Sequence, residues 1–348
     1  MYFKKDEVIK KVVELSYSSS HHSKDALNIA FGTDENFLFG CAISITSVLL
    51  KNPNQALAFH IFTDTLDSEN YNRFKSLAKQ YNTSITLYVV NCHWLKSLPN
   101  TKNWSYAIYF RFIAIDYFHH YIDRIIYLDS DIVCNGSLQE LSELNLKDYI
   151  IAAVAEGESP WWEKCAKRLA VSKIKNGYFN SGVLLINLEN WHRNNITTKT
   201  MMMLIDKDIT NRISYPDQDI LNMLLPEHIF FLDKKYNTQF SINYELKCKR
   251  GETYPHPIND KTVFIHYIGP TKPWHEWAIY PSSGYFYEAK AKSPWRDVPL
   301  EKANSANQLR YSSKHFFHKG KSFLAIINQN KYLIKKLKEI CKWEFLRK

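Results

Sequence analysis

The sequence predicts an α/β fold with a mainly parallel central sheet that is covered by helices on both faces. Apolar runs typical of strands alternate with helix patterns along the chain. The strand runs are continuously apolar, as in sheets that are buried on both faces. The 348 residues are 45% hydrophobic and 15% aromatic, which is enough for one large domain and a smaller appendage with packed cores.

The first half of the chain contains four predicted strands separated by helices. The strands are LNIAFG, LAFHIF, SITLYVV and RIIYL, at residues 27–32, 57–62, 84–90 and 124–128, and the helices span 42–52, 68–81 and 105–118. Ser68 is expected to cap the second helix, because a serine oxygen accepts well from the N–H groups of a first turn. Sheets of this kind bind ligands beyond the carboxyl ends of their strands.

The second half continues this pattern and then changes. It contains a predicted strand at 149–156, a helix at 161–171, the apolar run YFNSGVLLINLENW at 178–191, a helix that starts at Pro216, and a strand at 261–269. Pro, Ser and Gly then interrupt the pattern in PSSGYFYEAKAKSPWRDVP. We therefore expect one large domain at 1–275 and a small helical C-terminal domain at 276–348.

Positive charge is concentrated at the C-terminus. The net charge is +10, and residues 310–348 contain eleven Lys and Arg against Glu339 and Glu344. Charge confined to one end favours an acidic membrane surface over nucleic acid as the partner. The first residues lack the apolar run of a signal peptide, and no stretch is long and apolar enough to span a membrane. The six scattered cysteines fit a reducing cytosol.

The basic tail is predicted to form an amphipathic helix from about Ser322. Leu333, Leu337 and Ile340–Cys341 share one face of this helix. The residues off that face or at its end are Lys335, Lys336, Lys338, Lys342, Trp343 and Phe345. Basic helices with aromatic edges bind membrane interfaces, and the alternative is a helix packed on the core with a solvated lysine face.

Two aspartates one residue apart, Asp129 and Asp131, follow the apolar strand at 124–128. Their carboxylates repel each other, so a cation, a proton or open water must offset them. A divalent cation is the simplest explanation, because paired carboxylates suit Mg²⁺ or Mn²⁺; the structural alternative is a turn aspartate beside a surface aspartate. The run YLDSDIV also fits the D-x-D-x-[TV] motif of haloacid-dehalogenase-type phosphatases, whose first aspartate is a nucleophile.

Five motifs, in order, resemble family 8 of the retaining glycosyltransferases. They are IAFGTDENF, SYAIYFRF, FNSGVLLINLENW, YPDQDILNMLL and FIHYIGPTKPW, which begin at Ile29, Ser105, Phe179, Tyr215 and Phe264. Within the family the resemblance is to the bacterial lipopolysaccharide core α-glucosyl- and α-galactosyltransferases, and it covers roughly residues 27–277. It implies a GT-A type nucleotide-diphospho-sugar transferase fold, with the small C-terminal domain of those enzymes in the tail. The phosphatase hypothesis is weaker, because a later paired acidic motif is not evident.

The resemblance implies that Asp129 and Asp131 bind a divalent cation, with His266 as the third protein ligand. A set of two carboxylates and one imidazole suits Mn²⁺ slightly better than Mg²⁺. The cation would grip the diphosphate of a UDP-hexose and neutralise charge on the departing UDP.

The same resemblance assigns the other substrate-binding residues. Those expected at the nucleoside are Gly32, Thr33, Asp34 and Asn36, with Gly32 allowing close approach of the base or ribose. Those expected at the diphosphate are Arg111, Gly269 and Lys272, and those at the donor sugar are Asn180, Ser181, Asp217 and Gln218. Ser130, between the two aspartates, is also expected to bind the substrate. The structural alternatives are a simple turn at Thr33, an internal ion pair for Arg111 and a solvated Lys272.

The family implies that the α configuration of the donor is retained. Gln218 and Asp219 are the candidate catalytic residues. Gln218 best matches the position beneath the anomeric carbon but is a poor nucleophile, and Asp219 follows the start of the family's helix. We therefore expect front-face substitution, in which the leaving phosphate oxygen takes the acceptor proton and Gln218 steadies the oxocarbenium-like sugar.

The expected reaction moves glucose from UDP-glucose onto a lipopolysaccharide outer-core sugar with an α linkage, because the overall likeness is to the 1,2-glucosyltransferases. A UDP-galactose-dependent α-1,3-galactosyltransferase is the alternative, since the two sugars differ by one hydroxyl configuration. A non-enzymatic membrane-binding protein is the alternative of another class. The basic tail would hold a cytoplasmic protein on the inner membrane, where the unfinished core is anchored.

Overall fold

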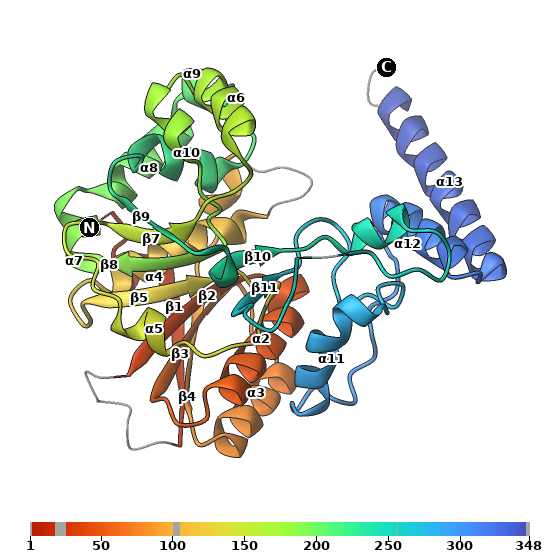
Figure 1. Cartoon of the computed structure of the whole chain (residues 1–348), viewed down its shortest axis with the longest axis horizontal. Coiled ribbons are helices and arrows are strands. Elements are labelled where there is room, and N and C mark those ends of the chain that lie inside the picture. Colours follow the sequence, from red (N-terminus) through yellow and green to blue (C-terminus); the bar gives the residue numbers. More distant parts are fainter. Residues whose placement is uncertain (1, 18–25, 100–104, 256, 346–348) are drawn as a thin grey trace.

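The chain folds around an eight-stranded sheet in a computed structural model that describes residues 2–17, 26–99, 105–255 and 257–345 (Figure 1). The strand order is β1-β4-β3-β2-β5-β8-β7-β9. The bounds are β1 (Ile9–Ser16), β2 (Leu27–Thr33), β3 (Leu57–Thr63), β4 (Ser84–Val90), β5 (Arg124–Leu128), β7 (Ile151–Val154), β8 (Val183–Asn187) and β9 (Ile229–Leu232). A second sheet, in the order β10-β11-β6, contains β6 (Ile132–Cys134), β10 (Thr238–Gln239) and β11 (Phe264–His266).

Helices cover both faces of the large sheet. The α-helices are α1 (Lys5–Val8), α2 (Leu38–Lys51), α3 (Ser68–Gln80), α4 (Phe110–Phe118), α5 (Gln139–Glu143), α6 (Ser159–Leu169), α7 (Leu188–Arg193), α8 (Ile196–Ile205), α9 (Lys207–Thr210), α10 (Pro216–Leu224), α11 (Gly284–Ala291), α12 (Ala306–His318) and α13 (Ser322–Phe345). The 3-10 helices are η2 (Glu35–Phe37), η3 (Leu95–Ser97), η4 (Tyr106–Tyr109), η5 (Ser172–Asn176), η6 (Lys234–Asn237), η7 (Ile242–Lys247) and η8 (Pro281–Ser283).

Successive residues of β2 belong to two different apolar clusters. Ile29 and Phe31 pack in the cluster that contains α2 and α3, whereas Ala30 packs in the cluster that contains α4, α7, α8 and α10. Because neighbouring side chains of a strand point to opposite faces, this division places one cluster on each side of the sheet. The predicted doubly covered α/β sheet is therefore confirmed.

The predicted strands of the first half are all present, and three helix details differ. The helix expected over 42–52 begins earlier, at Leu38. The helix expected over 105–118 begins as the 3-10 helix η4 and becomes α-helical at Phe110. The prediction that Ser68 caps α3 is wrong: Asp67 occupies the cap position, and its carboxylate accepts a hydrogen bond from the Asn70 N–H at 2.6 Å. An aspartate caps a helix as well as a serine does, so the sequence offered two adjacent candidates for the N-cap position.

The sequence analysis did not predict β1, which lies at the edge of the sheet and pairs antiparallel with β4. Its sequence, IKKVVELS, includes Lys10, Lys11 and Glu14 and is mostly exposed, so it lacks the long apolar run that marks a buried strand. The strands β4, β3, β2 and β5 run parallel to one another. The strand β8 runs antiparallel to both β5 and β7.

The reversed direction of β8 assembles one side of the candidate site. In an antiparallel pair, the end of one strand lies beside the start of the other. The end of β5 at Leu128 is paired with the start of β8 at Val183. The next residue of the chain, Asp129, donates its backbone N–H to the Gly182 carbonyl at 2.8 Å. The residues that precede β8 therefore lie beside the two aspartates that follow β5.

The small sheet supplies the other side of the site. The strand β6 begins directly after Asp131, and its partner β11 ends at His266, which is paired with Ile132. The turn that carries Asp129 and Asp131 therefore connects the two sheets. This arrangement brings a histidine from much later in the chain to the aspartate turn.

The C-terminal region is helical, as predicted. The helix α11 packs against α2, and α12 packs against α13, which extends away from the rest of the protein (Figure 1). The helix α13 begins at Ser322, as expected, and Leu333 and Leu337 on it are exposed. The side chains of Ile340, Cys341, Lys342, Trp343 and Phe345 lie outside the described part. Among the described residues, no helix has both the length and the apolar character that crossing a membrane requires.

Candidate active site

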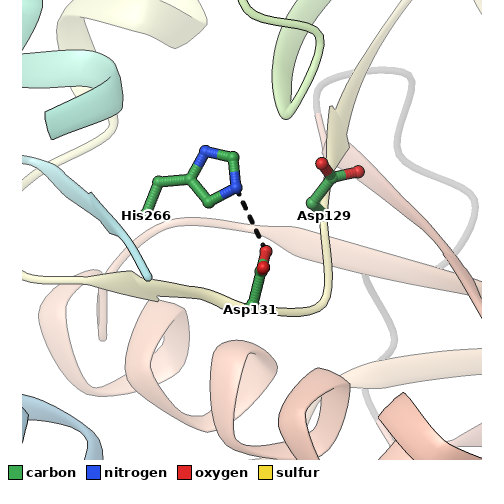
Figure 2. A group of neighbouring side chains, drawn as sticks. All are labelled: Asp129, Asp131 and His266. Atoms are coloured by element: carbon green, nitrogen blue, oxygen red, sulfur yellow. Dashed lines mark ion pairs between the residues drawn. The ribbon is translucent and has the colours of Figure 1, made fainter. Parts of the chain in front are cut away.

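The three predicted metal ligands meet at the junction of the two sheets. Asp129, Asp131 and His266 each offer one ligand atom, and these atoms all lie within 4.8 Å of one another. Figure 2 shows the His266 ring directed toward Asp131, with Asp129 beside them. The structure therefore brings together residues that are distant in sequence, as the resemblance implied.

Arg111 neutralises Asp129 from α4. Its guanidinium is buried and lies 2.9 Å from Asp129 Oδ1, 3.0 Å from Asp217 Oδ2 and 2.8 Å from the Ser181 carbonyl oxygen. It also lies over the Tyr127 ring, 4.5 Å from the centroid. Burial raises the pKa of Asp129, and Arg111 opposes that rise. Arg111 thus joins the aspartate turn to the start of α10. Its contacts form the internal ion pair that the sequence analysis gave as the structural alternative for Arg111.

Lys272 neutralises Asp131 from the loop that follows β11. Its ammonium group donates to Asp131 Oδ2 and, at 2.8 Å, to the Tyr267 carbonyl oxygen. Burial raises the pKa of Asp131, but Lys272 and His266 together lower it by more than burial raises it. The pKa of Asp131 is therefore below its ordinary value. Lys272 is buried and is not solvated. The loop turns at Gly269, whose φ of 85° lies in the left-handed region that favours glycine.

The donor set fits a divalent cation. The Asp131 Oδ1 atom is buried and accepts no hydrogen bond from the residues that the structure describes. It lies 3.2 Å from His266 Nε2, and the other nitrogen of that ring lies 3.0 Å from Asn237 Oδ1. A buried carboxylate oxygen without a donor is costly, and a cation between the oxygen and the imidazole nitrogen would satisfy both. Carboxylate oxygens with one imidazole match Mn²⁺ or Mg²⁺.

A glycine allows the histidine to approach the strand end. A Cβ on Gly182 would lie 2.4 Å from His266 Cε1 and 2.9 Å from its Nδ1. The same Cβ would lie 3.0 Å from Asn180 Oδ1. The glycine of the FNSGVLL motif is therefore required by the packing of the imidazole and the amide on either side of it.

The four predicted donor-sugar residues form one hydrogen-bonded cluster beside the metal ligands. Gln218 Oε1 accepts from the Ser181 backbone N–H at 3.0 Å and from Asn180 Nδ2 at 3.2 Å. Ser181 Oγ donates to Asp217 Oδ2 at 3.1 Å. We call Asn180, Ser181, Asp217 and Gln218 the sugar cluster. Its amides, hydroxyl and carboxylate are the groups that sugar hydroxyls require as partners.

Sequence reasoning missed Glu156, which holds the sugar cluster from the end of β7. Glu156 Oε2 accepts from Asn180 Nδ2 and from Gln218 Nε2, each at 2.9 Å. The signal that could have found it was present, because Glu156 follows an apolar strand as Asp129 does. The carboxylate fixes the Gln218 amide with its nitrogen toward Glu156 and its oxygen toward the Ser181 N–H.

The structure does not support Asp219 as a catalytic residue. Its side chain is fully buried, and its carboxylate accepts two hydrogen bonds from Arg168, at 2.7 and 2.8 Å, and one from Tyr178 at 2.6 Å. The backbone N–H groups of Ser214 and Tyr215 donate to it as well, at 2.6 and 2.9 Å. A carboxylate that accepts five hydrogen bonds has no lone pair available for attack on a sugar. Asp219 anchors the first turn of α10, and the prediction is corrected accordingly.

The predicted nucleoside loop lies at the end of β2. The Asp34 side chain caps η2 by accepting from the Asn36 N–H at 3.0 Å, and Thr33 Oγ1 donates to the Asp34 carbonyl oxygen at 3.1 Å. Gly32 is tightly packed at the start of this loop. A Cβ there would lie 2.7 Å from the Tyr127 hydroxyl and 2.9 Å from Phe110 Cβ, so packing within the protein requires the glycine.

Ser130 is buried between the two aspartates, and its main chain packs on α2. A Cβ on Gly40 of that helix would lie 2.6 Å from the Ser130 carbonyl oxygen. The close packing against α2 therefore fixes the position of the aspartate turn relative to that helix.

Family sequence models match nearly the whole chain. The model of glycosyl transferase family 8 matches residues 28–278, and the model of the glycosyl transferase family 8 C-terminal region matches residues 280–336. A lipopolysaccharide 1,3-galactosyltransferase of Salmonella typhimurium is 52% identical over 318 residues, which cover 91% of this chain and 93% of that protein. The lipopolysaccharide glucosyltransferase WaaO of Escherichia coli K12 is 46% identical, with 97% and 99% covered. An Escherichia coli lipopolysaccharide 1,2-glucosyltransferase is 41% identical, with 90% and 92% covered.

Solved structures share the fold. The galactosyltransferase LgtC, crystallised in complex with donor and acceptor sugar analogs, superposes with a TM-score of 0.65 at 24% identity, covering 78% of this chain and 99% of that one. The glycosyltransferase GlyE of Streptococcus pneumoniae TIGR4 superposes with a TM-score of 0.55 at 22% identity, covering 76% and 60%. These superpositions confirm the GT-A type fold that the motifs implied.

Proposed function

The chain belongs to glycosyl transferase family 8, and from that premise we propose that it transfers a hexose from a UDP-hexose to a lipopolysaccharide core sugar with retention of the α configuration. The observation that carries the proposal is the contact of Arg111 with both Asp129 and Asp217. This contact joins a cation site to the sugar cluster, as transfer of a sugar from a diphosphate requires. Family membership replaces the phosphatase hypothesis.

The two buried basic side chains of the site, Arg111 and Lys272, are proposed to exchange their aspartate partners for the diphosphate when the donor binds. Arg111 and Lys272 neutralise Asp129 and Asp131 in the protein alone. When it is bound, Mn²⁺ or Mg²⁺ would neutralise charge that develops on the departing diphosphate. Asp129, Asp131 and His266 would hold the metal, and Lys272 would then turn to the phosphate oxygens. Arg111 and Lys272 would thus supply the positive charge that a diphosphate requires.

Gln218 is proposed to steady the sugar, not to attack it. Its carbonyl oxygen already accepts from the Ser181 N–H and from Asn180, so it is held in place as a fixed dipole. Without a nucleophile, the front-face route remains, in which the leaving phosphate oxygen takes the acceptor proton. Replacement of Gln218 by alanine should lower kcat by about 10²-fold, the usual effect of removing one preorganised dipole. A kcat close to that of the unaltered protein would remove this role.

The donor sugar is proposed to be galactose, with glucose as the alternative. The expectation from the sequence was glucose. Of the relatives compared above, the galactosyltransferase shares 52% of its residues with this chain and the two glucosyltransferases 46% and 41%. The two donors differ by one hydroxyl configuration, which a small number of contacts can distinguish.

The C-terminal helices are proposed to bind the acidic inner face of the membrane that carries the acceptor. Phe317, Phe323, Ile326, Leu333 and Leu337 on α12 and α13 are all exposed, with Phe323 at 77%. Exposed apolar groups on a lysine-rich helix pair suit an anionic lipid surface. Deletion of residues 310–348 should release the protein from anionic vesicles, and unchanged vesicle binding would remove this part of the proposal.

The decisive experiment measures UDP release from a panel of UDP-sugars with truncated lipopolysaccharide, with and without Mn²⁺. Release that depends on the acceptor, occurs with one donor and is abolished by chelation would support the transferase and identify its sugar. Release that persists after complete chelation would contradict the proposed metal dependence. No release with any donor would contradict the proposed reaction.

A further inference from the structure

Asn237 lies buried directly behind the metal ligands, at the end of η6. Its side chain lies between two residues of the site. Asn237 Oδ1 is 3.0 Å from His266 Nδ1, and Asn237 Nδ2 donates to Asn180 Oδ1 at 2.8 Å. Only 3% of the residue is exposed. It has no place in the motifs that indicated the site, because neither periodicity nor a strand end marks it in the sequence.

The orientation of this asparagine follows from a backbone group. The Gly182 N–H donates to Asn180 at 2.9 Å, and because an N–H can only donate, the Asn180 atom that faces it is the oxygen. Asn237 faces the same oxygen, so it presents its NH₂ group there. Its own oxygen therefore faces His266.

The Asn237 oxygen decides which nitrogen of His266 is free. An amide oxygen can only accept, so the Nδ1 atom of His266 carries the proton that it donates. In the neutral imidazole, Nε2 is then unprotonated, and it faces Asp131 Oδ1 at 3.2 Å. An unprotonated nitrogen aimed at a carboxylate oxygen is what a cation between them requires.

We propose that Asn237 is a positioning residue that holds His266 in its metal-binding tautomer and couples the metal ligands to the sugar cluster through Asn180. The proposal rests on the metal dependence proposed above. Residues that hydrogen-bond the outer nitrogen of a metal-bound histidine typically change metal affinity by about 10–100-fold when they are removed. Asn237 has the geometry of such a residue on one side and of a sugar-site support on the other.

Two substitutions at Asn237 separate its two contacts. Asn237→Leu removes both, and Mn²⁺ binding to the full chain, measured by the electron paramagnetic resonance signal of free Mn²⁺, should weaken about 10–100-fold. The coupling of Mn²⁺ to a histidine nitrogen, seen by spin-echo modulation, should be lost with it. Asn237→Asp keeps an acceptor for His266 Nδ1 but loses the donor to Asn180. It should therefore bind Mn²⁺ nearly as well as the unaltered protein and show the nitrogen coupling, while its KM for the UDP-hexose rises.

The matched control is Asn190→Ala, which replaces another buried asparagine, one that donates to the Lys147 and Tyr149 carbonyl oxygens. It should cost stability without changing Mn²⁺ affinity. Equal Mn²⁺ affinity of Asn237→Leu and the unaltered protein would overturn the proposal, as would equal losses in Asn237→Asp and Asn237→Leu. If Asn237→Leu does not fold, the result with Asn237→Asp decides: lost Mn²⁺ binding in that variant overturns the proposal. If the unaltered protein binds no Mn²⁺, the metal dependence fails first.

Discussion

Two buried histidines of this protein have pKa values shifted in opposite directions. His266, in the candidate active site, and His315, at the junction between the catalytic region and the C-terminal helices, are both almost wholly inaccessible to solvent. Burial lowers the pKa of each, because it disfavours the imidazolium. At His266 the charges of Asp131 and Asp129 overcome that effect and the pKa is raised, whereas at His315 nearby Lys319 adds to it and the pKa falls to about 3.

The partners of the two histidines explain the difference. His266 belongs to a cluster of ionised groups in which each carboxylate has a cation, Arg111 or Lys272. The hydrogen-bond partners of His315 are neutral: its Nδ1 lies 2.8 Å from the Tyr280 hydroxyl and its Nε2 lies 2.9 Å from Asn243 Oδ1. Ionised pairs can exchange one charged partner for another when a ligand arrives, while neutral hydrogen bonds fix a single packing. The protein thus has an ionised cluster at its site and a neutral one at its junction.

Removing one charge from the ionised cluster should have the largest effect. Asp131→Asn leaves a side chain of the same shape but removes a carboxylate from the proposed cation site. We expect kcat/KM to fall by about 10³-fold, which corresponds to about 4 kcal/mol of lost transition-state stabilisation. The pKa of His266, followed by NMR, should fall in the same variant.

The control for this substitution is Glu140→Gln, which removes an exposed carboxylate from its pair with Lys235. Solvent screens exposed ion pairs, so activity should be unchanged. An Asp131→Asn protein as active as the control would show that Asp131 is not a metal ligand.

Adding one charge to the neutral cluster should make it resemble the active site. Asn243→Asp preserves the shape of the side chain and the acceptor for Thr271 Oγ1, which donates to it at 2.7 Å. The new carboxylate would face His315 Nε2 and raise the pKa of His315 by about 1–3. Titration of the His315 ring by NMR measures this directly. A pKa that stays near 3 would mean that burial, and not the missing carboxylate, separates the two histidines.

The ionised cluster around His266 could be predicted from the sequence, whereas the neutral cluster around His315 could not. Asp129, Asp131 and His266 each stand at the end of an apolar strand, where polar side chains are conspicuous, and the motifs supplied their roles. Asn243 and His315 are 72 residues apart, and each occupies a helix without a pattern that points to the other. The same limit applies to Asn237. Pairings of this kind depend on the packing of distant elements, which periodicity does not report.

The smallest effect concerns the pH dependence of stability. His315 has a pKa of about 3 in the folded protein and about 6.5 in an unfolded chain, so between these values the unfolded state binds the extra proton. Its contribution to stability is complete above pH 6.5 and is lost progressively as the pH falls, with a loss of about 2 kcal/mol at pH 5. His275 also has a pKa of about 3, but Glu301, 3.8 Å away, has its pKa raised to about 7 by burial, and its contribution has the opposite sign.

The contributions of His275 and Glu301 to the pH dependence of stability offset each other. The contribution of His315 is therefore best measured by comparing the unaltered chain with a variant that lacks this histidine. Denaturant unfolding of the unaltered chain and of His315→Gln at pH 7 and pH 5 gives the change in free energy of unfolding for each protein. Glutamine can hydrogen-bond Asn243 and Tyr280 but does not titrate. The unaltered chain should lose about 2 kcal/mol more than the variant between the two pH values. Equal losses would mean that His315 is protonated at pH 5 in the folded protein as it is in the unfolded chain. The contrast between the two clusters would then disappear.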